Sequence, residues 1–148
     1  MATHMTAEAE KAGKTSAGRI HCVVVTPERT LFDARVEFVA LPLYDGELGI
    51  LPGRTPLIGR LGFGELRTRD VTNINRYFID GGFAQVRDDV VTVLTNRAIP
   101  AAQIDAAAAA AELEQAQARR ATTDDEQSEK AKAVARARAQ LRVAEHRV

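Results

Sequence analysis

The chain has 148 residues, which is enough for one ordinary domain or for a small domain with an appendage. Its 20 basic and 20 acidic side chains give a formal net charge of zero, so no overall field would draw it onto nucleic acid or an anionic membrane. The single cysteine, Cys22, excludes an intramolecular disulfide and a thiolate-rich metal site, and the apolar runs are too short for a signal-peptide core or a membrane span.

Residues 1–18 are polar, small and without periodicity, which predicts a disordered extension. Residues 19–99 carry short apolar and β-branched runs between turn formers, a pattern typical of strands. Glycines divide the middle of this region. Gly62 separates two predicted strands, 56–61 and 64–68, while Gly81-Gly82 suggests that 83–87 pairs back on 76–80. Many short strands with no helix-length pattern between them predict an all-β sandwich or flattened barrel.

Residues 100–148 predict two helices. Alanine is the best helix former, and Ala106–Ala111 are six consecutive alanines, so we expect one helix over Ala101–Ala121. Thr123-Asp124-Asp125-Glu126 matches a capping box that would start a second helix, ending near Arg147. The short break between the helices predicts an antiparallel hairpin.

The predicted contact between these helices is thin. The second helix has a stripe at spacings of three and four: Val134, Ala137, Leu141, Ala144, Val148. Burial of apolar area stabilises a fold by ~25 cal/mol per Å², and alanine side chains bury little area. This seam therefore stabilises the hairpin by only a few kcal/mol, before the conformational entropy lost on ordering the helices is subtracted. We therefore expect a hairpin that is able to open or to leave the sandwich.

Charge is segregated along the hairpin. Acidic side chains dominate residues 105–129 and basic ones dominate residues 130–148. One interpretation is that cations near a helix C-terminus suit the macrodipole. The other is a docking strip for an acidic partner, and the two readings stand level.

The sequence offers no enzyme site. Gly13-Lys14-Thr15 lacks the earlier glycine, the strand and the helix of a phosphate loop. The three histidines have no metal-ligand spacing, so we expect no metal. Neighbouring residues on a strand point to opposite faces, so His21 and Cys22 suit a surface histidine and a core cysteine better than a catalytic pair.

One segment, 45–57, stands out because turn formers alternate with aliphatic residues. The glycines fit tight turns, while Glu47 and Arg54 also fit a rigid contact loop. Composition leaves these two interpretations equal.

The chain closely resembles the epsilon subunits of bacterial and chloroplast F-type ATP synthases. The resemblance runs from about Ile20 to the C-terminus, and its most specific stretch is Gly46-Glu47-Leu48-Gly49-Ile50-Leu51-Pro52-Gly53. Further matches are Val25-Thr26-Pro27-Glu28, Leu31-Phe32, Gly81-Gly82-Phe83, Val91-Thr92-Val93-Leu94 and Ala139-Gln140-Leu141-Arg142-Val143-Ala144-Glu145.

The resemblance implies a sandwich of about ten strands, then the helical hairpin, in a non-catalytic subunit. Its partners would be the gamma subunit and the c-ring, on the cytoplasmic face of the bacterial inner membrane. It would couple proton flow to ATP synthesis and restrain ATP hydrolysis. The contact loop would comprise Glu47, Leu48, Gly49, Ile50, Leu51, Pro52, Gly53 and Arg54, where relatives often have His in place of Arg54.

The resemblance also implies that the hairpin extends toward the catalytic beta subunits, and alpha, and meets an acidic segment. The candidate docking residues are Arg119, Arg120, Arg136, Arg138 and Arg142. Some relatives bind ATP through a motif of which Ile104 and Asp105 remain here, while Ala108 replaces its arginine. Losing guanidinium contacts removes strong phosphate binding, so we expect no cofactor and weak or absent ATP sensing.

An alternative function remains open at this stage. The chain would then be a free-standing β-sandwich binding module that dimerises through its helical tail. It predicts a homodimer without affinity for gamma.

Overall fold

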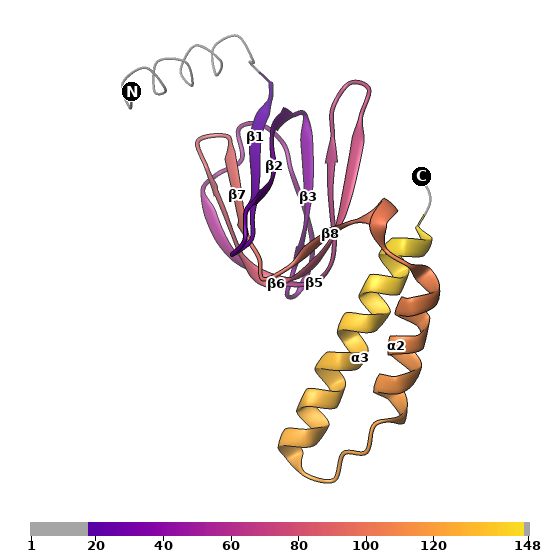
Figure 1. Ribbon diagram of the computed structural model, residues 1–148. Helices are drawn as coiled ribbons and strands as arrows, with labels where there is room; N and C mark the ends of the chain where they lie inside the picture. Colours follow the sequence, from indigo (N-terminus) through magenta and orange to yellow (C-terminus); the bar gives the residue numbers. More distant parts are fainter. Residues whose placement is uncertain (1–17, 147–148) are drawn as a thin grey trace.

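The computed structural model describes residues 18–146 and shows a β-sandwich with two helices on one side (Figure 1). The expected disordered extension, 1–18, lies outside the described residues except for Gly18. The eight strands are β1 (Ile20–Val25), β2 (Thr30–Val36), β3 (Phe38–Leu43), β4 (Gly46–Ile50), β5 (Leu57–Arg69), β6 (Ile74–Arg87), β7 (Val90–Leu94) and β8 (Ala98–Pro100).

The sheet folds over on itself through its two longest strands. Its order is β2-β1-β7-β6-β5-β3-β4, with β8 also paired to β6. All pairs are antiparallel except β1 with β7. The second half of β6 lies beside β7, whereas its first half lies beside β8. The strand β6 therefore belongs to both layers of the sandwich, and β5 accompanies it along its whole length.

The predicted divisions at Gly62 and Gly81-Gly82 were wrong. β5 and β6 each continue through their glycines, and 83–87 does not pair back on 76–80. The glycines bend the strands instead of ending them, since Gly81 and Gly82 have φ of 71° and 109°. The inward-facing positions change parity at each bend. If each long strand is counted on both sides of its bend, the expected ten strands are recovered.

The main core lies between the two layers. In β1, every second side chain points inward, so Ile20, Cys22 and Val24 are fully buried. Cys22 is therefore a core cysteine, as predicted, and His21 on the opposite face lies beside Asp33. The core is continuous across β3, β5, β6 and β7.

The helical region begins later than expected. A short 3-10 turn, η1 (Ala101–Gln103), precedes α2 (Ala106–Ala118). The Asp105 carboxylate accepts hydrogen bonds from the amides of Ala107 (3.0 Å) and Ala108 (3.3 Å), so it is the N-cap of α2. The single helix predicted over Ala101–Ala121 was thus wrong at both ends.

The second helix, α3 (Asp124–Glu145), begins where the capping box predicted. The Thr123 hydroxyl accepts from the Glu126 amide at 3.1 Å. The two helices pack antiparallel through small residues, with Ala109, Ala116 and Ala137 buried (Figure 1). Val148, the last member of the expected stripe, lies outside the described residues.

Candidate regulatory interface

The hairpin docks on the outer face of the sandwich through a small second core. Phe78 of β6 is fully buried against Ala139 and Val143 of α3. Four half-buried residues surround this contact: Phe63, Ile99, Ala101 and Ile104. Phe78 faces the hairpin while its neighbour Ile79 enters the main core, because side chains alternate along a strand. One strand thus serves two separate cores.

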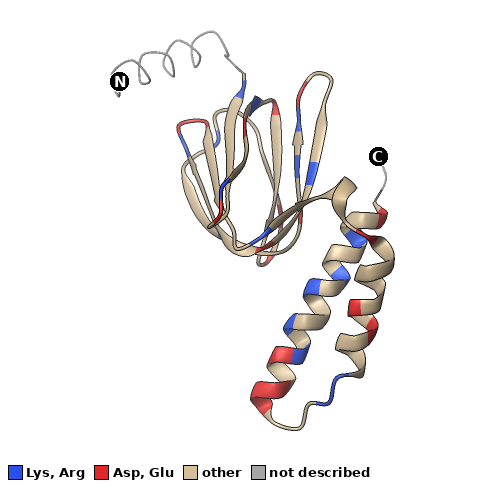
Figure 2. Cartoon of the chain, viewed as in Figure 1, with Lys and Arg blue, Asp and Glu red and all other residues tan. Residues whose placement is uncertain are grey.

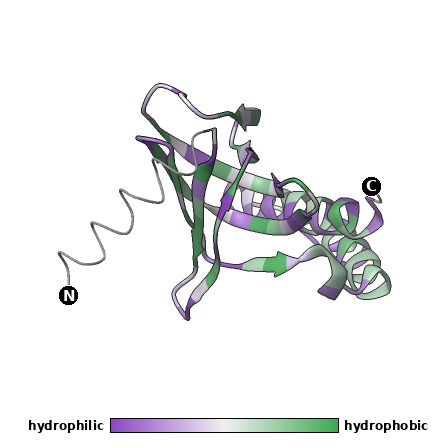
Figure 3. Cartoon of the chain, turned by 90° about the horizontal axis from the view of Figure 1, so that it is seen from above, coloured by the Kyte–Doolittle hydropathy of each residue, from purple (hydrophilic) through white to green (hydrophobic). Residues whose placement is uncertain are grey.

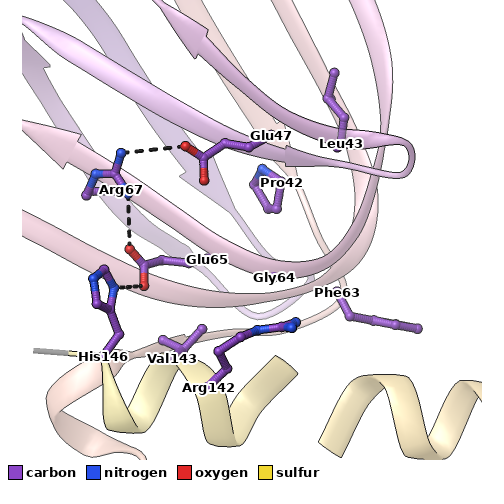
Figure 4. Close-up of a pocket in the computed structure, with 11 residues that line it drawn as sticks. Pro42, Leu43, Glu47, Phe63, Gly64, Glu65, Arg67, Arg142, Val143 and His146 are labelled. Atoms are coloured by element: carbon purple, nitrogen blue, oxygen red, sulfur yellow. Dashed lines mark hydrogen bonds and ion pairs between the residues drawn. The ribbon is translucent and has the colours of Figure 1, made fainter. Parts of the chain in front are cut away.

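Polar groups close the C-terminal end of α3 onto the sheet (Figure 4). The Arg76 guanidinium donates to the Val143 carbonyl at 2.8 Å and to Glu65 Oε2 at 3.0 Å. His146 Nδ1 lies 2.9 Å from the same Glu65 oxygen. Because the last carbonyls of a helix lack intrahelical partners, Arg76 stabilises α3 where a cation is most useful.

The environment of Glu65 favours its charged form. Burial raises the pKa of Glu65, but the hydrogen bonds and charges of Arg76 and His146 outweigh burial and hold this pKa below its usual range. Arg67 adds a further contact 3.5 Å away. The carboxylate is therefore the electrostatic centre of this end of the interface.

A second polar contact holds the middle of α3. Arg136 Nε donates to Asp80 Oδ1 at 3.0 Å, and its guanidinium lies 5.0 Å from the centre of the Phe63 ring. Phe63 and Asp80 are directly opposite each other on β5 and β6, so their side chains share the face that meets α3.

The predicted basic face divides in the structure. Arg136, Arg138 and Arg142 line a groove between α3 and the sandwich, together with Lys132 and Arg60. The blue bands along α3 in Figure 2 are the Lys and Arg residues of this helix. Arg119 and Arg120 are exposed in the connection between the helices. The structure therefore gathers three of the five candidates in this groove. Arg119 lies outside the groove but lines a hollow between the helices together with Arg136.

The predicted contact loop is mostly strand β4 and the turn after it. Glu47 lies at the start of β4, 3.6 Å from Arg67, whereas Arg54 is exposed beyond its end. Ile50 is buried in the main core, and Leu51 is exposed. The Gly53 amide donates to Asp89 Oδ1 at 2.7 Å, which ties the turn to the β6–β7 connection. Glu47 therefore has an ion-pair partner on β5, whereas Arg54 is exposed at the turn.

An exposed apolar patch that the sequence pattern did not indicate consists of Ile58, Phe83 and Leu94. Their exposed fractions are 77%, 59% and 54%. Phe83 and Leu94 are cross-strand partners on β6 and β7, which brings them together. The hairpin lies at one side of the sandwich, and Figure 3 shows how much of the sheet it leaves uncovered. The signal in the sequence that could have indicated this patch is Phe83, an aromatic residue directly after Gly81-Gly82.

The docking residues were also missed. Ala139 and Val143 lie on a different face of α3 from the predicted stripe, and Asp80 and Glu65 come from strands whose pairing was misjudged. Within residues 18–146, no group of three or more His, Cys, Asp or Glu side chains is placed to hold a metal ion. No helix in that same range has both the length and the apolar character that crossing a membrane requires.

Among known protein families, residues 19–101 match the model of the β-sandwich domain of the ATP synthase delta/epsilon chain. The ATP synthase epsilon chain of Rhodopirellula baltica is 64% identical over 86 residues, covering 58% of this chain and 67% of that one. The chloroplastic epsilon chain of Guillardia theta is 42% identical over 58% of this chain and 66% of its own length. These alignments thus span about two thirds of the relatives' length.

Structural likeness extends further along the chain. A chain of the Euglena gracilis mitochondrial ATP synthase OSCP/F1/c-ring structure matches with a TM-score of 0.78 and 26% identity, covering 87% of this chain and 82% of that one. A chain of the Tetrahymena thermophila mitochondrial ATP synthase central stalk/c-ring structure shares the fold, with a TM-score of 0.66 and 14% identity over 84% and 96% of the two chains. Matches of this extent include the helical hairpin as well as the sandwich.

Proposed function

Because the chain belongs to the ATP synthase delta/epsilon chain family, we propose that it is the epsilon subunit of the central stalk of a rotary F-type ATP synthase. The observation that carries this proposal is the family match over residues 19–101, combined with a fold match over 87% of this chain to one chain of the Euglena F1/c-ring structure. In this role the chain links gamma to the c-ring and couples proton translocation to ATP synthesis, without a catalytic site of its own.

The sandwich is proposed to hold the rotor partners. The exposed patch of Ile58, Phe83 and Leu94 supplies apolar area that a partner would remove from water. The segment from Glu47 to Arg54 supplies a second contact, with Leu51 and Arg54 exposed at the turn. Binding gamma and the c-ring in this way places the subunit on the cytoplasmic face of the bacterial inner membrane, as a peripheral component.

The hairpin is proposed to be the regulatory part. Its contact with the sandwich is one small apolar cluster closed by a few ion pairs, so it separates at lower cost than the sandwich unfolds. Released, it would present Arg119, Arg120, Arg136, Arg138 and Arg142 to an acidic segment of the beta subunits and oppose rotation in the hydrolysis direction. Such charge pairs weaken as salt rises.

ATP sensing at the hairpin is proposed to be weak or absent. Of the partial motif, Ile104 packs in the second core and Asp105 caps α2, so both residues have structural partners. Ala108 follows where a guanidinium would be needed for strong phosphate binding. Titration calorimetry of the full chain tests this directly, and micromolar affinity for ATP would reject it.

A binding experiment with gamma tests the proposed function. Purified chain should co-purify with gamma, and Phe83→Asp should weaken this binding by more than tenfold by placing an unpaired charge in the apolar patch. Val71→Asp, at another exposed apolar position, is the matched control and should bind like the unchanged chain. Failure of the unchanged chain to bind gamma would reject the assignment.

The alternative of a dimerising module has less support. The alanine seam it would use is occupied within the chain, since Ala109, Ala116 and Ala137 are buried between α2 and α3. Size measurement of the purified chain distinguishes the two, because the module hypothesis requires a homodimer.

A further inference from the structure

Arg136 belongs to the basic face and is also paired with the sandwich. Its Nε donates to Asp80 Oδ1 at 3.0 Å, and its guanidinium covers the Phe63 ring. The Asp80 side chain is 15% exposed, so the ion pair is partly shielded from water. In the docked hairpin, the Arg136 guanidinium is therefore bound to Asp80, although the proposed function assigns it to an acidic partner.

The receptor for Arg136 is built into the sheet. Phe63 and Asp80 are fixed opposite each other by the β5–β6 register. Asp80 also lies 3.6 Å from Arg97 through its other oxygen, Oδ2, and its amide donates to the Arg97 carbonyl. These contacts lie within the sandwich, and Oδ1 is the carboxylate oxygen that meets α3.

We propose that Asp80 competes with the acidic partner for Arg136 and so restrains the inhibitory action of the hairpin. An anion of the partner and the Asp80 carboxylate need the same guanidinium, so docking on the sandwich and full engagement of the partner exclude each other. Arg138 and Arg142 stay exposed on the docked helix, which leaves them accessible for a first encounter. This inference rests on the proposed regulatory role of the hairpin.

The first test measures docking in the isolated full-length chain. Distance labels at Asn96→Cys and Ala131→Cys span the groove between the sandwich and α3. Asp80→Asn should raise the undocked fraction about tenfold, as expected for losing a charge-assisted hydrogen bond. Asp33→Asn is the matched control, because it removes a carboxylate that pairs with His21 inside the sandwich and should leave the hairpin docked.

The second test measures ATP hydrolysis after reconstitution with alpha, beta and gamma. Asp80→Asn should strengthen inhibition severalfold, since it frees Arg136 for the partner. Arg136→Gln should undock the hairpin equally but weaken inhibition, since it removes the shared cation. Opposite effects from the two halves of one ion pair are the signature of competition, which a merely structural role would not produce.

The outcomes separate the two proposals. If deleting residues 101–148 leaves hydrolysis unchanged, the regulatory function itself is rejected. If that deletion relieves inhibition but Asp80→Asn fails to strengthen it, or shifts it in the same direction as Arg136→Gln, competition at Arg136 is overturned and the regulatory function stands.

Discussion

Gly82 is the residue on which the bend of β6 depends. Its φ of 109° lies in a region that side chains disfavour, and a Cβ at this position would collide with the Leu94 carbonyl oxygen. Gly53 has a similar φ of 85° but open space around its Cα. Comparing Gly53 with Gly82 therefore separates two effects of a side chain on stability: the strain of a positive φ, which both positions share, and the steric collision, which only Gly82 has.

Substituting alanine at these glycines should have unequal effects. Gly53→Ala should lower the free energy of unfolding by about 1–2 kcal/mol, the cost of a left-handed conformation. Gly82→Ala should cost more than about 3 kcal/mol because strands β6 and β7 must also move apart. Urea unfolding of both variants measures the difference, and equal losses would contradict this account of the bend.

Cys22 should be unreactive in the folded chain. Burial, with a smaller effect from the charge of Asp33, raises the pKa of the Cys22 thiol to about 12. Because the thiolate is the reactive species, a thiol reagent at pH 8 should label the chain in urea and leave the native chain unlabelled. Rapid labelling without denaturant would show that β1 is not closed over this side chain.

Residue-level prediction succeeded where the cause was local. The capping box at Thr123 was identified because its donor and acceptor lie within one helical turn. Asp105 was assigned to a partial ligand motif, although an aspartate before six alanines also fits an N-cap. The partners of Glu65 are distant in sequence, at Arg76 and His146, so composition gave no indication of them.

At the scale of elements, glycines in strands were interpreted as ends when they are bends. Both long strands keep their hydrogen-bonded pairing through the bend, while the inward positions shift from odd to even residue numbers. In the sequence, a strand that changes layers therefore resembles two separate strands, because the alternation of inward and outward residues shifts by one position at the bend. The fold class was predictable, whereas strand continuity depends on pairing that only the folded sheet reveals.

The same scale explains why the docking face of α3 was missed. The predicted stripe describes the side that meets α2, and a second, narrower face carries Ala139 and Val143 toward the sheet. Two small residues among arginines give a weak apolar signal. The partner surface, Phe63 and Phe78, becomes apparent only when β5 and β6 are aligned.

Glu65 should make stability depend on pH in the acid range. Its pKa is held below the usual range in the folded chain, so its contribution is present above the ordinary glutamate pKa of about 4.3 and is lost as pH falls through the folded value. Glu65→Gln should therefore be less stable than the unchanged chain at pH 7, and the two should converge toward pH 3.

The measurement is the free energy of unfolding across that range. Glu114→Gln, at an exposed position on α2, is the control and should follow the unchanged chain throughout. A constant gap between the unchanged chain and Glu65→Gln down to pH 3 would show that the carboxylate charge is not responsible.

At the scale of the whole molecule, the two parts differ in how they are held together. The sandwich has a continuous core across its layers, whereas the hairpin contacts it through one small cluster and a few polar links. The two-part architecture was predictable from composition. That the hairpin lies docked, with Arg136 already paired, was not, because this contact joins Arg136 to Asp80, which is far away in the sequence.

The central claim is that the sandwich binds the rotor while the separable hairpin restrains hydrolysis. It is tested most directly by reconstituting alpha, beta and gamma with either the full chain or residues 1–100, and measuring binding and ATP hydrolysis together. We predict that both forms bind with similar affinity and that hydrolysis is severalfold faster with the shorter form. Equal rates with both forms bound, or loss of binding on removal of the hairpin, would contradict the account.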